Sequence, residues 1–179
     1  MGIVNKTFTY KSIPVMKTLY MGLIRPRVEY CVQAWSPHQR KDIEKMQRRA
    51  TKMIPELRQL SYEDRLVRLQ LTTLEERRLR GDMIQTFKLV NGYENVDPNR
   101  YFKLNPSVYG TRRHSKSLYV TRTRLDCRKY FFSNRVVTPW NSLSEDCVTA
   151  SSVNAFKNSY DKHVEQKKVK ELINPYSFQ

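Results

Sequence analysis

Four cations on one predicted helix are the residues of this chain best suited to bind an anion. Lys45, Arg48, Arg49 and Lys52 recur at three- and four-residue spacing, so they share one helical face. Like charges at this spacing repel one another, and a phosphate backbone would relieve that repulsion. Exposed basic helix faces are also common where nothing binds. The pattern therefore indicates either a phosphate-contacting surface or a face that is only solvated.

A second basic stretch, residues 111–135, mixes cations with aromatic side chains. It holds eight basic residues and the single acid Asp126. Tyr130, Phe131 and Phe132 follow the cations closely, a composition typical of surfaces that stack single-stranded nucleic acid. The alternative is that these aromatics belong to the core. The segment Leu118–Thr121 has β-propensity and is expected to form a short strand.

The overall charge favours nucleic acid as the partner. The chain has 179 residues, with 33 Lys and Arg against 17 Asp and Glu, a net charge of +16. An excess of this size attracts polyanions. A membrane surface is the next candidate, but the cations are spread along the chain, and no run of about 18 apolar residues occurs. We expect an intracellular protein, nuclear or cytoplasmic and not secreted, because the first ten residues lack a signal-like apolar segment.

Residues suited to catalysis or metal binding do not cluster in the sequence. The acids are scattered and no Asp-Asp pair occurs, whereas two-metal enzymes need grouped carboxylates. The three histidines and the three cysteines lack metal-ligand spacing. We therefore expect no metal, no cofactor and no catalytic residue, and an enzyme with an unrecognised site is the least favoured class.

The elements that position these residues are expected to be helices joined at proline and glycine. One helix should start near Ser12, with Pro26 dividing it, and others should follow Ser61, Thr73 and Ser152. We expect a mainly α fold, in which a helical thumb-like bundle precedes a small basic domain with α structure and a short β segment. The expected boundaries are a helical region at 1–92, a linker at 93–110, the basic domain at 111–168 and a tail at 169–179.

The order of motifs resembles the carboxy-terminal part of reverse transcriptases from jockey-like LINE (non-LTR) retrotransposons. The resemblance covers roughly residues 3 to 164 and is specific because many motifs fall in the same order. The motifs are Lys17–Tyr20, Leu23–Pro26, Glu29–Pro37, Gln47–Ile54, Leu60–Glu63, Glu76–Asp82, Phe131–Val137 and Pro139–Leu143. The matching region of that family is the helical thumb and the domain after it, and the catalytic palm lies upstream.

The resemblance implies a non-catalytic fragment of an RNA-directed DNA polymerase that grips a primer–template duplex. The expected partner is RNA or DNA, bound without sequence preference, and no catalytic residue is carried over. The apolar face of residues 15–24 would pack on a palm domain. The candidate nucleic-acid-binding residues are Arg40, Lys41, Lys45, Arg48, Arg49, Lys52, Arg77, Arg78, Arg112, Arg113, Arg122, Arg124, Arg128 and Lys129.

One departure from the family pattern weakens part of this assignment. Family members usually carry about one more helical turn between a segment like Lys41–Glu44 and the Gln47–Arg49 core. Losing three residues rotates one end of a helix against the other by about 60° and shortens it by about 4.5 Å. One interpretation is that the chain comes from a retrotransposon copy that is accumulating deletions. Another is a host-retained adaptor that docks on a protein through its apolar N-terminal helix.

Overall fold

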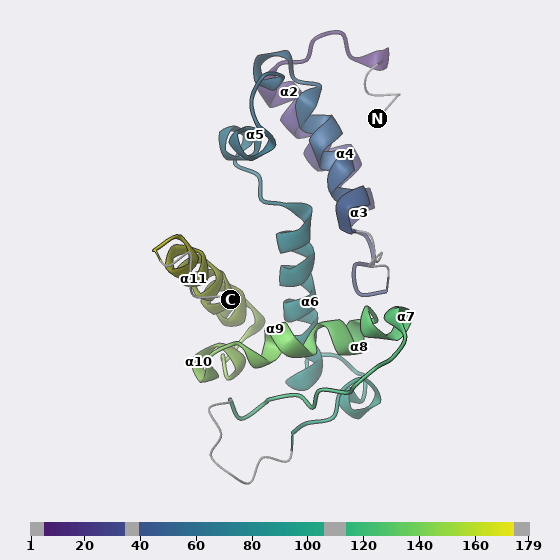
Figure 1. The fold of residues 1–179 in the computed structure, drawn as a ribbon, viewed down its shortest axis with the longest axis vertical. Helices are drawn as coiled ribbons and strands as arrows, with labels where there is room; N and C mark the ends of the chain where they lie inside the picture. The colour runs from purple at the N-terminus through teal and green to yellow at the C-terminus, as the bar shows by residue number, and fades with distance from the viewer. Residues whose placement is uncertain (1–5, 35–39, 106–113, 174–179) are drawn as a thin grey trace. The chain divides into compact units, whose positions relative to one another are not determined.

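The computed structural model describes residues 6–34, 40–105 and 114–173, and it confirms the predicted mainly α fold (Figure 1). Of residues 40, 41 and 171–173 only the backbone is described. Most of the described helices are joined by short connections, except that the described residues between Arg100 and Asp126 form no helix, and within these ranges the only β feature is an isolated bridge. No described helix is both long enough and apolar enough to cross a bilayer.

The chain divides into two compact units, residues 1–79 and 80–179. The division lies inside the helix α6 (Leu74–Val90), whereas the sequence pattern placed a joint at 93–110. The reason is the carboxy-terminal half of α6, where Met83, Phe87 and Leu89 are buried in the core of the second unit. The helix therefore belongs in part to each unit, and proline and asparagine after it mark only a loop.

The N-terminal helical segment of unit 1 is continuous through Pro26. It comprises α2 (Ile13–Leu19), the π-helical turn η1 (Tyr20–Ile24) and α3 (Arg25–Glu29). Proline has no N–H for a helical hydrogen bond, and the π turn ahead of it accommodates the missing donor without a break. Helix α2 starts after Ser12 as predicted, although the Ser12 side chain makes no capping bond. The expected second arm stops at Glu29, and Cys31 adopts a left-handed φ of 48°.

The rest of unit 1 contains α4 (Arg40–Lys52), the 3₁₀ turn η2 (Pro55–Leu57) and α5 (Tyr62–Leu69). The predicted start of α5 is confirmed, because the Ser61 hydroxyl accepts a hydrogen bond from the Asp64 amide at 3.1 Å. Helix α6 starts in the same manner, with the Glu76 amide donating to Thr73 Oγ1 at 3.1 Å. These caps satisfy amides that have no partner inside a helix.

The apolar face of the N-terminal helix is largely covered inside unit 1. Met16 packs with Ile54, Leu57 and Leu69, and Tyr20 and Ile24 pack with Ala50. The apolar face of residues 15–24 is therefore less open than the sequence pattern indicates. The reason is that Ala50 of α4, Leu57 of η2 and Leu69 of α5 supply apolar partners within unit 1. Met21 and Leu23 remain 40% and 50% exposed.

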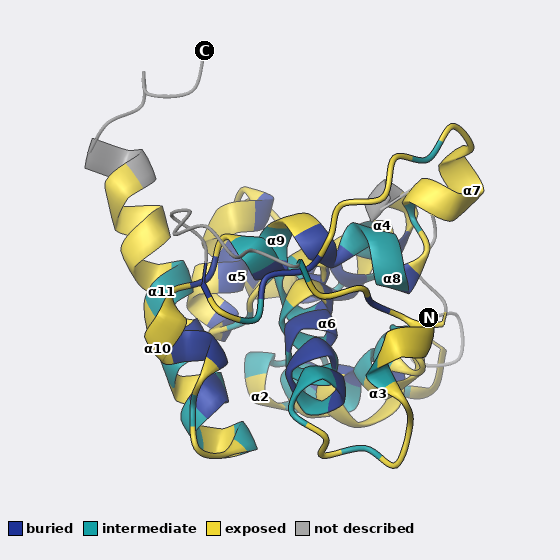
Figure 2. Ribbon diagram, turned by 90° about the horizontal axis from the view of Figure 1, so that it is seen from below, coloured by how far each residue is buried: buried dark blue, intermediate teal, exposed yellow. Residues whose placement is uncertain are grey.

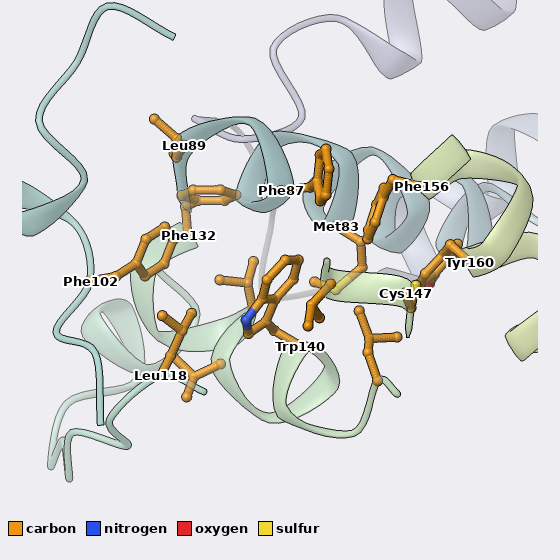
Figure 3. Packing of buried hydrophobic residues seen from close by; sticks show 14 residues of the cluster. Met83, Phe87, Leu89, Phe102, Leu118, Phe132, Trp140, Cys147, Phe156 and Tyr160 are labelled. Carbon is orange, nitrogen blue, oxygen red and sulfur yellow. The ribbon is translucent and has the colours of Figure 1, made fainter. Parts of the chain in front are cut away.

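Unit 2 is built around one cluster of fourteen buried apolar residues (Figure 3). Its elements after α6 are η3 (Pro98–Arg100), α7 (Asp126–Lys129), α8 (Phe132–Arg135), α9 (Val137–Asn141), α10 (Glu145–Val148) and α11 (Val153–Ile173). Phe87 and Phe156 stack at 4.4 Å between ring centroids, and Trp140 lies beside them. In Figure 2 the α6 turns of this core are buried, whereas the carboxy-terminal turns of α11 are exposed.

The predicted strand at Leu118–Thr121 is not formed. Leu118 makes a single antiparallel bridge with Leu104, and Tyr119 N donates to Lys103 O at 2.8 Å. The side chain of Asn141 takes the other side of the same backbone: its Oδ1 accepts from Leu118 N and its Nδ2 donates to Leu118 O, both at 2.8 Å. An amide side chain thus satisfies the groups that a strand neighbour would need, and no ladder extends.

Candidate nucleic-acid interface

Helix α4 separates a buried side from a cationic side, as its pattern predicts, but the buried side is more polar than expected. The buried residues are Ile43, Gln47, Ala50 and Thr51, with Ile54 just beyond the helix. Met46 and Met53 are only half-buried. Arg48, Arg49 and Lys52 are exposed. The opposite side of the helix is therefore fixed in the core, so these cations face solvent.

A network of buried polar groups holds α4 in place. Gln47 is 1% exposed, its Oε1 accepts from the Tyr20 hydroxyl, and its Nε2 donates to Thr72 O at 3.0 Å. Arg65 is also buried and donates from Nη1 to Arg48 O at 3.1 Å. The sequence did not reveal that Gln47 and Arg65 are buried, because their hydrogen-bond partners lie far away in the sequence.

The four cations of α4 differ in their surroundings. Lys45 Nζ lies 2.6 Å from Asp42 Oδ1, so its charge is already paired. The Arg48 guanidinium lies 4.2 Å from the ring centroid of Tyr62. Arg49 and Lys52 have no hydrogen-bond or ion-pair partner among the described residues. The side chains of Arg40 and Lys41 lie outside the described part of the chain.

Tyr62 links the cationic side to the fold. Burial raises the pKa of its phenol, and the hydrogen bond that it donates to Glu44 raises it further. The other oxygen of Glu44 accepts from the Leu74 amide at 3.1 Å, at the start of α6. Arg48 therefore stacks on a ring that the fold holds rigidly, and it has a packing role in addition to its charge.

Two predicted binding residues, Arg77 and Arg78, face other parts of unit 1. Arg77 forms a forked ion pair with Glu29, with Nη2 3.0 Å from Oε2. Arg78 is 8% exposed and donates to Val28 O at 3.0 Å. The inclusion of Arg78 in the interface is wrong, because a buried guanidinium cannot reach a phosphate. Both residues attach α6 to the end of α3.

The second basic stretch also separates into inward and outward cations. Arg135 forms a bidentate ion pair with Asp82, both bonds at 2.9 Å, and each side chain is at most 10% exposed. Lys116 donates to Asn91 Oδ1. Arg122, Arg124, Arg128 and Lys129 are exposed. Arg112 and Arg113 lie outside the described residues. Four predicted binding residues thus remain available in this stretch.

The aromatic residues of the stretch divide in the same way, and the core alternative is confirmed for Phe132 alone. Phe132 is 5% exposed and packs on Phe102 at 5.8 Å between centroids, in the core (Figure 3). Phe131, the residue before it, is 55% exposed. Tyr130 is half-buried, with the Lys129 ammonium 5.8 Å from its ring centroid. Neighbouring residues at the start of α8 point to opposite sides.

Phe131 lines a cleft of about 580 Å³ that lies wholly within unit 2. The cleft is lined by Asn99, Arg100, Tyr101, Phe102, Lys103, Tyr119, Thr121, Cys127, Arg128, Phe131, Ser133, Asn134 and Val137. This lining contains three cations and no carboxylate. Arg100, Tyr101, Lys103 and Tyr119 were missed in the sequence analysis, although in Arg100–Lys103 two aromatic residues lie between two cations.

No three His, Cys, Asp or Glu side chains lie together as a metal site would require within the part of the chain described. Comparisons with known protein families, with curated proteins and with solved structures found no match to this chain.

Proposed function

We propose that this chain binds nucleic acid without sequence preference, through the phosphate backbone of a duplex lying against the exposed side of α4. The observation that carries the proposal is the set Arg48, Arg49 and Lys52. These residues occupy one face of a helix whose opposite face is buried, and two of them have no partner among the described residues. The net charge of +16 supports it by drawing polyanions to the chain.

The proposed role is that of the thumb-like part of an RNA-directed DNA polymerase, which holds the primer–template duplex and supplies no catalytic group itself. The support for this role is the order of sequence motifs that resemble non-LTR reverse transcriptases. The adaptor alternative is less favoured, because Met16, Tyr20 and Ile24 are already buried inside unit 1 and only Met21 and Leu23 of this face stay exposed.

A salt titration of duplex affinity tests the proposal. Each phosphate that a cation contacts releases condensed counterions, so the logarithm of affinity falls with the logarithm of salt by about 0.9 per contact. The variant Arg49→Gln/Lys52→Gln should flatten this slope by about two units, because both side chains face solvent. Arg48 is left in place, since it stacks on Tyr62.

The matched control is Lys162→Gln/Lys170→Gln, which removes the same charge from exposed positions of α11. Its slope should stay near that of the parent protein. Equal slopes for the parent and the α4 variant would show that the α4 face is only solvated. Equal changes in both variants would show that only net charge matters. Sequence preference should not change, because backbone contacts do not read bases.

A further inference from the structure

We infer that the unit 2 cleft is a separate binding site for single-stranded nucleic acid, in which bases stack on exposed aromatic rings and cations contact the phosphates. This inference does not depend on the α4 surface, since the cleft belongs to the other unit and shares no residue with α4.

The first argument is the exposure of three rings in one cleft. Tyr101, Tyr119 and Phe131 are 41%, 54% and 55% exposed, and all three line the cleft. Exposed rings that share a concave site offer flat apolar faces, which bases of any sequence can stack upon. Bases inside a duplex are already stacked and paired, so this chemistry selects single strands.

The second argument is that the rings are held on a rigid base. Tyr101 lies next to Phe102, which is 5% exposed and packs on Phe132. Tyr119 is attached through its amide to Lys103 O, and Phe131 directly precedes the buried Phe132. Because each exposed ring adjoins a backbone or side chain fixed in the core, little ordering is needed on binding.

The third argument is charge. Arg100, Lys103 and Arg128 line the cleft, and no Asp or Glu does. Arg122 and Arg124 are exposed on the segment that follows Tyr119, and the nearest acid in that segment, Asp126, is outside the lining. A cleft lined by both aromatic rings and cations suits a strand that carries both bases and phosphates, whereas an apolar peptide would leave the cations unused.

Affinity for short single strands, measured by fluorescence anisotropy of the full chain at fixed salt, tests the inference. The probes are a 12-nucleotide RNA, the DNA of the same sequence, and a DNA of the same length without bases. The parent should bind both base-bearing strands at least five-fold more tightly than the abasic strand. Tyr119→Ala/Phe131→Ala should lose about five-fold or more for each ring removed and should no longer distinguish the abasic strand.

Two single substitutions separate stacking from apolar contact. Phe131→Trp should retain binding, because the indole stacks at least as well, and Phe131→Leu should lose it despite similar apolar bulk. A site for an apolar peptide would keep its affinity in Phe131→Leu and would not distinguish the base-bearing strands from the abasic strand. Tyr10→Ala is the matched control, since Tyr10 is a 74% exposed aromatic outside the cleft, and it should bind like the parent.

The exposed cysteines locate the bound strand in the same protein. Cys127 lines the cleft, Cys31 is exposed in unit 1, and Cys147 is buried. A bound single strand should slow alkylation of Cys127, read by peptide mapping, and leave Cys31 unchanged. A duplex bound at α4 should leave Cys127 reactive. The inference is overturned if the abasic strand binds equally well, if the double variant binds like the parent, or if Cys127 is not protected. Loss of duplex binding alone would count against α4 only.

Discussion

The interiors of the two units are built differently from a similar stock of residues. In unit 1 the buried apolar residues form two small clusters, and α4 presents Gln47 and Thr51 to the interior among Ile43, Ala50 and Ile54. In unit 2 fourteen residues form one cluster in which aromatic rings touch one another. The comparison indicates that unit 1 relies on satisfied hydrogen bonds where unit 2 relies on contact between rings.

The largest effect should come from the aromatic core. Phe156 is fully buried and stacks on Phe87, so Phe156→Ala should cost about 3–5 kcal/mol of unfolding free energy in unit 2. Urea unfolding with hydrogen exchange mapped to residues 80–173 measures it. Val169→Ala, at a 48% exposed position of the same helix, is the control and should change little. An equal loss of protection in residues 13–79 would contradict the separation of the two interiors.

A smaller effect is expected from the polar interior of unit 1. Gln47→Leu keeps the volume similar but leaves the Tyr20 hydroxyl and Thr72 O without their partner, at a cost of about 2–3 kcal/mol. Tyr20→Phe should lower the free energy of unfolding less in the Gln47→Leu variant than in the parent protein, because the hydroxyl that it removes is already unpaired in that variant. Additive costs in this double-mutant cycle, measured by urea unfolding, would show that the network contributes little.

Alkaline pH should destabilise both units, through different buried groups. Burial raises the pKa of Tyr20 and Tyr62 in unit 1, and in unit 2 it raises the pKa of Tyr160 to about 12. A raised pKa means that the unfolded chain loses the proton first. The contribution of each buried tyrosine to the free energy of unfolding is therefore full below pH 10. It falls as the pH rises towards the pKa of that tyrosine in the folded protein, by at most about 1.4 kcal/mol per pH unit for each tyrosine.

Urea unfolding between pH 9 and pH 11, followed by hydrogen exchange in each unit, measures this difference. In unit 1 the loss should come from Tyr20 and Tyr62, and in unit 2 from Tyr160 and Cys147, because burial also raises the pKa of the Cys147 thiol. Tyr160→Phe should reduce the pH dependence in unit 2 alone. An unchanged pH dependence in that variant would contradict the role given to Tyr160.

The smallest expected effects concern two glycines of unit 2. Gly81 lies inside α6 with nothing within 4 Å of an added Cβ, so the site has room for a methyl group. Gly81→Ala should stabilise by about 0.5–1 kcal/mol. Gly92 has equally open space but a φ of +71°, so Gly92→Ala should destabilise by about 1 kcal/mol. Thermal melting of both variants tests the opposite signs.

The helix starts could be predicted because capping depends on residues close in sequence. Burial could not be predicted as well, because it depends on contacts between residues far apart in sequence. Ser61, Thr73 and Ser152 cap helices through bonds that span three residues, so sequence spacing is enough to find them. Burial of Arg78 depends on Val28, fifty residues away, and no spacing rule reaches that far. Arg78, which the sequence pattern places among the exposed binding residues, is therefore buried in the structure.

The same distinction applies to the candidate site. The cationic face of α4 follows from one helical period, and the structure places Arg48, Arg49 and Lys52 on it as expected. The cleft joins residues 99–103 to residues 119–137, and neither stretch alone shows that the other lies beside it. Phe132 faces the core because it packs on Phe102, and this leaves Phe131 exposed. Composition alone could not show which of the two rings is buried.

The contact between Asn141 and Leu118 has a consequence for how the protein behaves at high concentration. Residues 118–120 combine β-propensity with exposed Tyr119 and Val120, features that in an open strand edge recruit the same segment of another molecule. Here Ser117 O and Tyr119 N are hydrogen-bonded to the 103–105 segment on one side, and the N–H and C=O of Leu118 are hydrogen-bonded to the Asn141 amide on the other. A single side chain thereby blocks the site where intermolecular strand addition, and hence aggregation, would begin.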